Sequence, residues 1–329
     1  MINADKPIFS SSEDLLSRSK FSKYLASSLL SLTNLNRDSF TVSLCGKWGS
    51  GKTSILNLVV EEILKQSENI DISRKPIIVR FNPWNYSQTE DLLSQFFSAL
   101  KNQLRVNDKS KTLKSVGTAL EKYSALFDYA PYVHPLGVIL LPLKVIAKGL
   151  GNTIKAKGNR DSDVIMQKEK VTKALKDQKH TIIILIDDID RLNNTQIRLV
   201  FQLVNSIAGF PNIIYLLAFD KDIVARALMQ EQNCNGEEYL EKIIQIPFNI
   251  PEVKAVTIEM IFIHELNKIL GDLQISYTNR NYFDNVFRCI KPMIRNIRDM
   301  KRVLNVFQFN YDLLKSETNW IDLLVITIL

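Results

Sequence analysis

The sequence predicts an α/β protein in which helices cover both faces of a parallel β-sheet. Five short apolar runs alternate along the chain with segments of helical periodicity, and this alternation is typical of βαβ units. One run, at residues 181–186, is continuously apolar and rich in β-branched residues, as expected for a strand buried on both faces. A third observation is the apolar run at residues 40–45, which leads directly into a glycine-rich loop and then an apolar helix.

The elements follow in order from these patterns. A first helix is expected at Ser12–Leu32, because polar residues that favour a helix start precede its apolar face. The expected strands are Thr41–Cys45, Pro76–Phe81, His180–Asp187, Asn212–Phe219 and Ile243–Phe248. The expected helices of the sheet region are Asp91–Leu104, Gln196–Ile207 and Lys221–Met229, and those after Pro251 are Ile258–Leu270, Tyr282–Ile290 and Ile294–Leu314.

Domain organisation follows the same reading. We expect a lead helix in residues 1–37, a nucleotide-binding core in residues 38–250 and a helical lid in residues 251–329 that continues, on one reading, beyond the end of the sequence. A basic, mostly helical insertion is expected at about residues 105–165, before the third strand.

The glycine-rich loop has the spacing G-x-x-x-x-G-K-[ST] from Gly46 to Thr53, which is the Walker A pattern of a phosphate-binding loop. Glycines let the backbone turn its N–H groups inward as an anion nest, and the following helix adds its positive N-terminal end. Lys52 is expected to hold the β- and γ-phosphates, and the Thr53 hydroxyl to bind Mg²⁺. The expected nucleotide-binding residues are Gly46, Trp48, Gly49, Ser50, Gly51, Lys52, Thr53 and Ser54.

The second half of this site is expected at the end of the third strand, where Asp187 and Asp188 follow the apolar run. In α/β sheets, ligands bind outside the carboxyl ends of the strands. Asp187 is expected to hold Mg²⁺ together with Thr53, and Asp188 to polarise the attacking water. Because Asp is one methylene shorter than the Glu common at this place, we expect hydrolysis to be slow or to depend on a trigger. A solvated strand-to-helix turn is the simpler alternative for Asp187–Arg191.

Composition agrees with an intracellular protein, and we expect a cytoplasmic location. The chain has 329 residues, of which 46% are hydrophobic, and only three cysteines, which we expect to be reduced thiols. The start has no secretory pattern, and no stretch has the roughly 18–20 apolar residues that span a bilayer. The nearest is Pro135–Leu143, which we read as a buried helix, with peripheral membrane contact as the alternative.

Positive charge is concentrated in one segment. Residues 101–180 hold 16 basic and 7 acidic residues, a net charge of +9, so the rest of the chain carries −2 against the overall +7. A solvated helical face explains such lysine spacing, whereas binding to nucleic acid or to acidic lipid is the sharper alternative.

Six sequence blocks together resemble the KAP family of P-loop ATPases and cover nearly the whole chain in family order. The blocks are Gly46–Ser54, Phe81–Tyr86, Asp187–Leu192, Leu217–Asp220, Tyr239–Phe248 and Arg298–Asn305. The Asn-Pro-Trp of the second block is the most diagnostic. The resemblance implies an ATPase of the additional-strand class, often membrane-associated, found in animal signalling scaffolds and bacterial phage-exclusion systems. Many members carry transmembrane helices before Walker B, and this sequence has none there.

The resemblance also suggests roles for two further residues. Asp220 looks like the polar sensor that ends the fourth strand, although capping of the next helix explains it equally well. Arg298 looks like a sensor arginine that reaches the phosphates from the lid, with a surface salt bridge to Asp299 as the alternative.

Several other residues are candidates for the nucleotide site. Packing is the preferred reading for Trp84, and the preferred reading for Leu15, Leu16 and Phe21 is core, with a wall for the adenine as the alternative. Candidates for an arginine finger donated to a neighbouring subunit are Arg191, Arg198 and Arg226.

The sequence favours ATP over GTP, because no N-K-x-D block follows any expected strand. We therefore expect an ATP- and Mg²⁺-dependent ATPase that acts as a conformational or oligomerisation switch in antiphage defence or signalling, with a homo-oligomer or an effector as partner. Two alternatives stay open: a nucleic-acid-stimulated motor that uses the basic segment, and a phosphotransferase that uses the same loop.

Overall fold

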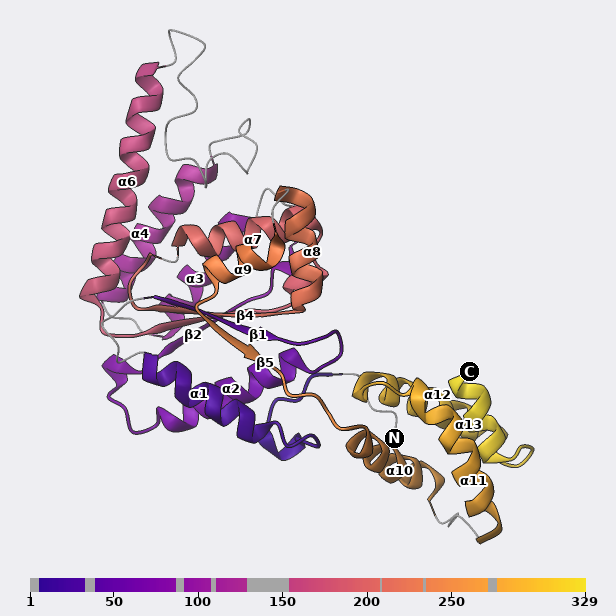
Figure 1. Cartoon of the computed structure of the whole chain (residues 1–329). Helices are drawn as coiled ribbons and strands as arrows, with labels where there is room; N and C mark the ends of the chain where they lie inside the picture. The colour runs from indigo at the N-terminus through magenta and orange to yellow at the C-terminus, as the bar shows by residue number, and fades with distance from the viewer. Residues whose placement is uncertain are drawn as a thin grey trace.

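A computed structural model describes residues 6–32, 39–86, 92–107, 111–128, 154–207, 209–232, 235–271 and 277–329. Its centre is a five-stranded sheet with the order β2-β3-β4-β1-β5, in which every pairing is parallel (Figure 1). The strands are β1 (Phe40–Cys45), β2 (Ile77–Phe81), β3 (Ile182–Ile186), β4 (Ile213–Phe219) and β5 (Ile246–Asn249). The predicted α/β class is thus confirmed.

The strands form because alternate side chains enter two separate apolar cores. On β3, Ile182, Ile184 and Ile186 join one core, while Ile183 and Leu185 join the other. All five residues of β3 and all seven of β4 are buried, which explains their continuous apolar runs. Pro247 is tolerated in β5 because this strand lies at the edge of the sheet and pairs only with β1.

Helices cover both faces of the sheet (Figure 1). The helices α1 and α2 pack on one face, and α3, α4, α6, α7, α8 and α9 build the core of the other. Their bounds are α1 (Ser19–Leu32), α2 (Lys52–Gln66), α3 (Leu92–Asn107), α4 (Lys111–Asp128), α6 (Ile154–Asp177), α7 (Asn194–Ile207), α8 (Lys221–Gln232) and α9 (Gly236–Ile243).

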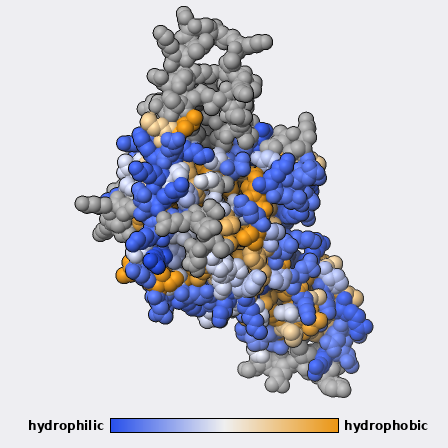
Figure 2. Space-filling model, turned by 60° about the vertical axis from the view of Figure 1, so that its left-hand side comes forward, coloured by the Kyte–Doolittle hydropathy of each residue, from blue (hydrophilic) through white to orange (hydrophobic). Residues whose placement is uncertain are grey.

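The C-terminal helices bury a core of their own. They are α10 (Ala255–Leu270), α11 (Tyr277–Ile290), α12 (Ile297–Leu314) and α13 (Trp320–Ile328), with the short 3₁₀ turn η6 (Lys291–Met293) between α11 and α12. The rings of Phe262, Phe283 and Phe287 stack at the centre of this core, and Trp320 packs against Phe283. In Figure 2, apolar atoms show between polar ones on this part of the surface.

Two expected elements differ from the structure. Residues 12–32 do not form one helix, because a 3₁₀ turn η1 (Ser11–Glu13) ends before α1 begins at Ser19. Asp14 separates them: its carboxylate accepts hydrogen bonds from the N–H groups of Leu16 and Ser19, and such local bonds compete with a continuous helix. Ile243 lies in α9 rather than in the last strand.

The segment Pro135–Leu143, expected as a buried helix with peripheral membrane contact as the alternative, lies outside the described residues, as do residues 108–110 and 129–153 of the basic insertion. What the structure describes of that insertion is helical, in α4 and α6. Among the described residues, no helix combines the length and the apolar character that a bilayer crossing needs.

Candidate functional site

The phosphate-binding loop joins β1 to α2 at the carboxyl edge of the sheet. Gly49 and Gly51 have φ values of 79° and 88°, in the left-handed region that residues with a side chain rarely adopt. The Gly46 N–H donates to the carbonyl of Phe219 at 3.1 Å, which fixes the start of the loop to the end of β4. Two glycines of the loop thus have positive φ, and α2 begins at Lys52.

The Lys52 ammonium is held by protein oxygen atoms. Its Nζ lies 3.0 Å from the carbonyl oxygen of Gly46 and 2.9 Å from Oδ2 of Asp190. The side chains of Lys52 and Asp190 are only 10% and 2% exposed, so this ion pair is sheltered from water. Asp190 is not among the residues predicted for the site; its only sequence signal is its place as a third acid in the short acidic stretch after β3.

Asp187 and Thr53, the two residues predicted to hold Mg²⁺, lie within hydrogen-bonding distance of each other. Burial raises the pKa of Asp187 above its ordinary value, whereas the hydrogen bond with the Thr53 side chain opposes that rise. One carboxylate oxygen also accepts the N–H of Asp188 at 2.8 Å. Among the described residues, no three His, Cys, Asp or Glu side chains form a ready-made metal site. This pair suits Mg²⁺, which takes one or two protein ligands and completes its shell with phosphate and water.

Both carboxylate oxygens of Asp188 are engaged by other side chains. Asn82 Nδ2 donates to Oδ2 at 2.8 Å, and Arg191 Nε lies 2.7 Å from Oδ1. Asp188 itself has a left-handed backbone with φ of 56°, which turns the chain from β3 into the 3₁₀ turn η5 (Ile189–Arg191). Asn82 comes from the end of β2, immediately before the turn η3 (Pro83–Asn85). Two neighbouring strands thus bring their polar ends to one carboxylate.

Asp220 fulfils its expected capping role and also contacts the phosphate-binding loop. Its Oδ1 accepts the N–H of Asp222 at 3.1 Å in the first turn of α8, and its Oδ2 accepts the N–H of Trp48 at 3.2 Å. The Trp48 N–H therefore points to β4. As an ionised carboxylate accepts but does not donate hydrogen bonds, Asp220 in this form supports the loop rather than binding phosphate oxygen directly.

Two guanidinium groups lie over the indole ring of Trp48. The Cζ atom of Arg191 is 5.1 Å from the centre of the indole ring and that of Arg298 is 6.0 Å from it. Such distances are typical of cation–π contacts. Arg298 stands in the first turn of α12, whose N-cap residue Asn296 lies so close to Gly49 that a Cβ there would be 3.3 Å from its side chain. The C-terminal helices thus contact the loop at two points.

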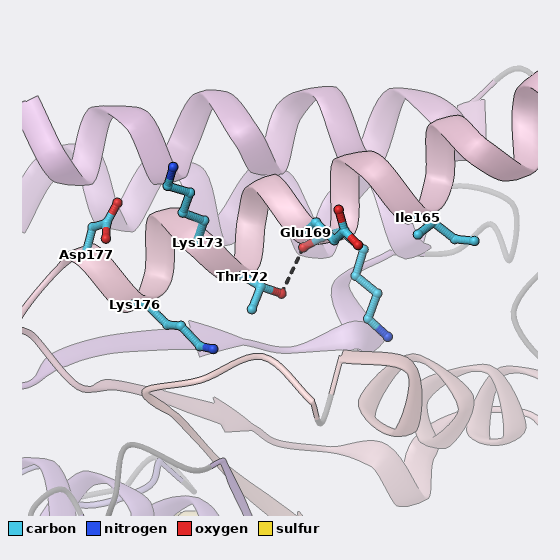
Figure 3. A pocket seen from close by; sticks show the side chains of 7 residues that line it. Ile165, Glu169, Thr172, Lys173, Lys176 and Asp177 are labelled. Carbon is cyan, nitrogen blue, oxygen red and sulfur yellow. Dashed lines mark hydrogen bonds between the residues drawn. The ribbon is translucent and has the colours of Figure 1, made fainter.

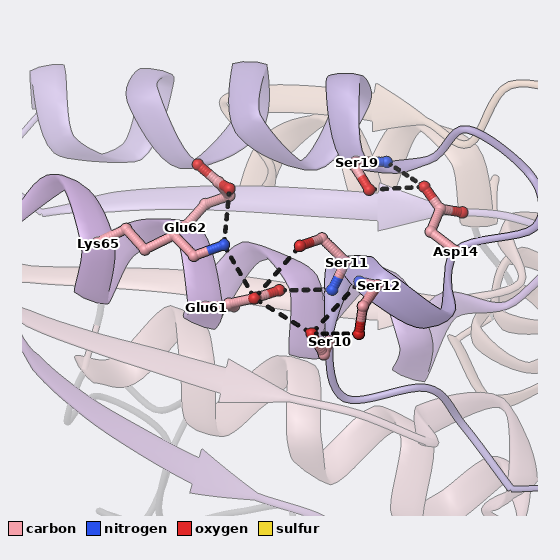
Figure 4. Close-up of polar contacts among 8 residues, drawn as sticks. All are labelled: Ser10, Ser11, Ser12, Asp14, Ser19, Glu61, Glu62 and Lys65. Carbon is pink, nitrogen blue, oxygen red and sulfur yellow. Dashed lines mark hydrogen bonds and ion pairs between the residues drawn. The ribbon is translucent and has the colours of Figure 1, made fainter.

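The segment before α1 crosses the helix that follows the loop (Figure 4). The Ile8 N–H donates to Ser54 Oγ at 3.3 Å, and its carbonyl accepts from Asn57 Nδ2 at 2.8 Å. One turn further along α2, Glu61 accepts the N–H of Ser11 at 2.8 Å. The predicted nucleotide-binding residue Ser54 therefore directs its hydroxyl to this segment.

A comparison with known families decides the wider identity of the chain. The profile of the KAP family P-loop domain matches residues 18–314. The chain belongs to the KAP family. A curated relative of this KAP chain is the phage T7 exclusion protein of Escherichia coli K12, which is 27% identical over 239 residues, covering 65% of this chain and 30% of the relative. The KAP chain thus matches less than a third of that protein's length.

Solved structures similar to the KAP chain include two archaeal proteins. The Aeropyrum pernix ORC2 protein in its ADP form has a TM-score of 0.49 and 13% identity over 99% of this chain and 71% of that one. The Walker-type ATPase PABY2304 of Pyrococcus abyssi has a TM-score of 0.44 and 13% identity over 99% of this chain and 75% of that one.

Several residues of the KAP chain that were candidates for the nucleotide site lie away from the phosphate-binding loop. Trp84 is not a packed anchor, because 53% of it is exposed; Pro83 is the buried residue of that turn. Leu15 is 56% exposed, whereas Phe21 packs edge-on against Phe248, which supports its reading as core. Of the arginine-finger candidates, Arg226 donates to the carbonyl of Asp222 within α8, while Arg191 lies at the loop.

The basic segment of the KAP chain carries a cavity of about 500 Å³ along α6 (Figure 3). Its lining residues are Ile165, Lys168, Glu169, Thr172, Lys173, Lys176 and Asp177, and none belongs to the phosphate-binding loop. Three lysines and two acidic residues among the seven give the lining a net charge of +1.

Proposed function

We propose that this KAP domain binds ATP with Mg²⁺ at the phosphate-binding loop and hydrolyses it slowly, as a nucleotide-driven switch in antiphage defence. The observation that carries the proposal is the juxtaposition of the two metal-binding candidates: Thr53, at the start of α2, is hydrogen-bonded to Asp187, at the end of β3. Lys52, the neighbour of Thr53, lies at the same edge of the sheet, where its side chain is sheltered from water.

Each residue has a defined task in this proposal. The loop N–H groups and Lys52 hold the β- and γ-phosphates, while Thr53 and Asp187 hold Mg²⁺. When bound, the metal ion neutralises charge on the phosphates. Asp188 would polarise the water that attacks the γ-phosphate.

Slow or triggered turnover is proposed because Asp188 already has two partners. Asn82 and Arg191 occupy its two oxygens, at 2.8 and 2.7 Å. Each carboxylate oxygen has a second lone pair open to water, but these two donors fix the direction in which those lone pairs point. A partner that moves either side chain would therefore accelerate hydrolysis.

The switch would connect the loop with the C-terminal helices. Arg298 and Asn296 both reach the loop from the start of α12, so a phosphate that draws the Arg298 guanidinium inward would move this helix. The output would pass to a second copy of the chain or to an effector. The role in defence rests on the phage T7 exclusion protein as a relative.

Two substitutions test the proposal. Lys52→Ala should abolish ATP binding in calorimetry with Mg²⁺, whereas Asp188→Asn should keep binding and lose release of inorganic phosphate. Undiminished hydrolysis by both variants would refute the assignment, and labelled product other than inorganic phosphate would indicate a phosphotransferase. Expression of the full-length protein should lower the plating efficiency of phage T7, and Lys52→Ala should restore it.

A nucleic-acid-stimulated motor is the second candidate function, because the C-terminal half of α6 exposes several lysines beside the cavity. The exposed lysines are Lys168, Lys170, Lys173 and Lys176. Binding of DNA or RNA that weakens with salt and accelerates ATP turnover would favour it. Unchanged turnover with both nucleic acids would leave the switch as the better account.

A further inference from the structure

The three donors of the Lys52 ammonium all face protein oxygens. Besides Gly46 O at 3.0 Å and Asp190 Oδ2 at 2.9 Å, the carbonyl of Lys47 lies 3.5 Å away, at the limit of a hydrogen bond. An ammonium group has no fourth donor. A phosphate oxygen that binds Lys52 must therefore replace one of these oxygens or share a donor with it.

Asp190 is the charged member of that set. Its side chain is 2% exposed, and it lies on η5, one turn from the carboxylates that end β3. Because both partners are sheltered, the attraction between them is weakly screened, and neither can regain full hydration while the loop keeps its shape. Asp190 is thus a resident counter-ion of the lysine that the phosphates need.

Negative charge around the loop adds to the competition between Asp190 and a phosphate oxygen for Lys52. Asp187, Asp188, Asp190 and Asp220 surround the same edge of the sheet, and Lys52 is paired with one of them. Free ATP brings a net charge of −4 to these carboxylates, whereas ATP with Mg²⁺ brings a net charge of −2 and includes a cation that Asp187 can bind.

We propose that Asp190 is a specificity-determining residue that competes with phosphate for Lys52 and makes the loop select metal-bound nucleotide over free polyanions. This inference rests on the proposed function, because it concerns the same nucleotide site. The proposal assigns Asp190 to Lys52, its partner at 2.9 Å, and leaves the metal ion to Thr53 and Asp187.

The test compares Asp190→Asn with the wild-type protein. The amide keeps the size of the side chain and a hydrogen-bond acceptor for Lys52, but it removes the charge. Asp222→Asn is the matched control, because it removes one charge from an exposed side chain on α8. The probes are ATP with EDTA, pyrophosphate with EDTA, and ATP with Mg²⁺, each measured by calorimetry.

Asp190→Asn should bind free ATP and pyrophosphate at least tenfold more tightly than the wild type, and ATP with Mg²⁺ by a smaller factor. Asp222→Asn should match the wild type with all three probes. If Asp190→Asn binds free ATP no more tightly than the wild type, the role of Asp190 is overturned. If the Asn variant does not fold, as judged by circular dichroism, Asp190→Ser is measured under the same criteria.

The two proposals fail in different ways. A wild-type protein that binds no ATP with Mg²⁺ overturns the nucleotide site itself, and the inference about Asp190 with it. A wild-type protein that binds ATP with Mg²⁺, together with an Asp190→Asn variant of unchanged preference for the metal-bound form, overturns only the role of Asp190.

Discussion

Asn82 Nδ2 donates a 2.8 Å hydrogen bond to Oδ2 of Asp188, so the end of β2 holds a carboxylate at the end of β3. The pairing of these two strands brings the residues together, because Phe81, the last residue of β2, is in register with Ile186, the last residue of β3. One side chain outside the phosphate-binding loop thereby restrains the group that we assign to water activation.

Asn82→Ala should raise basal ATP turnover severalfold, because Asp188 would lose one of its two partners. Turnover is measured as phosphate release at saturating ATP and Mg²⁺. Asn85→Ala is the control: it removes the same type of side chain from the same turn, and Asn85 is exposed. A fall in turnover for Asn82→Ala would mean that Asn82 positions Asp188 productively instead of restraining it.

Asp187→Asn should stabilise the nucleotide-free protein at pH 7.5. Burial raises the pKa of Asp187 in the folded state, so the folded protein binds this proton more tightly than the unfolded chain. The resulting stabilisation is complete below the ordinary Asp pKa and is lost as the pH rises through the folded value. The neutral amide avoids that loss, and the free energy of unfolding should rise on the order of 1 kcal/mol.

Denaturant unfolding at two pH values checks this expectation. The gain should shrink at pH 4.5, because the raised pKa of Asp187 lets a larger share of the folded wild-type protein carry this proton there than at pH 7.5. Asp284→Asn, which alters an exposed carboxylate on α11, should give no comparable gain at pH 7.5. Equal unfolding free energies for Asp187→Asn and the wild type at pH 7.5 would argue against a burial cost at Asp187.

Trp48 should report nucleotide binding by its fluorescence. Its indole is half exposed and contacts Arg191 and Arg298, so phosphates that attract either guanidinium should change its surroundings. ATP with Mg²⁺ should shift or quench the emission of the wild-type protein, and Trp48→Phe should lose most of that response. Trp320→Phe should retain it, because Trp320 is buried among the C-terminal helices.

Glu61→Ala should expose the segment before α1 to protease. Glu61 accepts the N–H of Ser11 and the hydroxyl groups of Ser10 and Ser11, which fasten that segment to α2. Limited proteolysis should cleave residues 6–18 several times faster in this variant. The Glu62→Ala variant should be cleaved like the wild type, because among the residues drawn in Figure 4 Glu62 is joined to Lys65, at 3.6 Å, and not to the segment.

The strands were predictable because burial on two faces leaves a strong sequence pattern. The runs ending at Cys45, Ile186 and Phe219 are almost wholly apolar, and each lies within two residues of its predicted end. The break between η1 and α1 was not predictable from periodicity, since it depends on hydrogen bonds that Asp14 makes to nearby backbone.

At the site, motif spacing located the loop, Asp187 and Asp188, but not the pairings among their neighbours. The Lys52–Asp190 and Asn82–Asp188 contacts join residues 138 and 106 positions apart, so they depend on how the strands are ordered. Trp84 was misjudged because an aromatic ring is usually buried, whereas in this turn Pro83 takes the buried place.

The position of β4 limits where further contacts to a bound phosphate can originate. With β4 between β1 and β3, the strands that carry the two halves of the site lie two interstrand spacings apart, roughly 9–10 Å, and the Lys52 and Asp190 side chains bridge that distance. The end of β4 lies between these two strands, and Asp220 directly follows it. Its carboxylate already accepts hydrogen bonds from the backbone N–H groups of Trp48 and of Asp222 in α8. A positively charged side chain that contacts the γ-phosphate must therefore come from a segment outside the strand ends. The guanidinium groups of Arg191 and Arg298 already lie near this place, where both contact Trp48 of the loop.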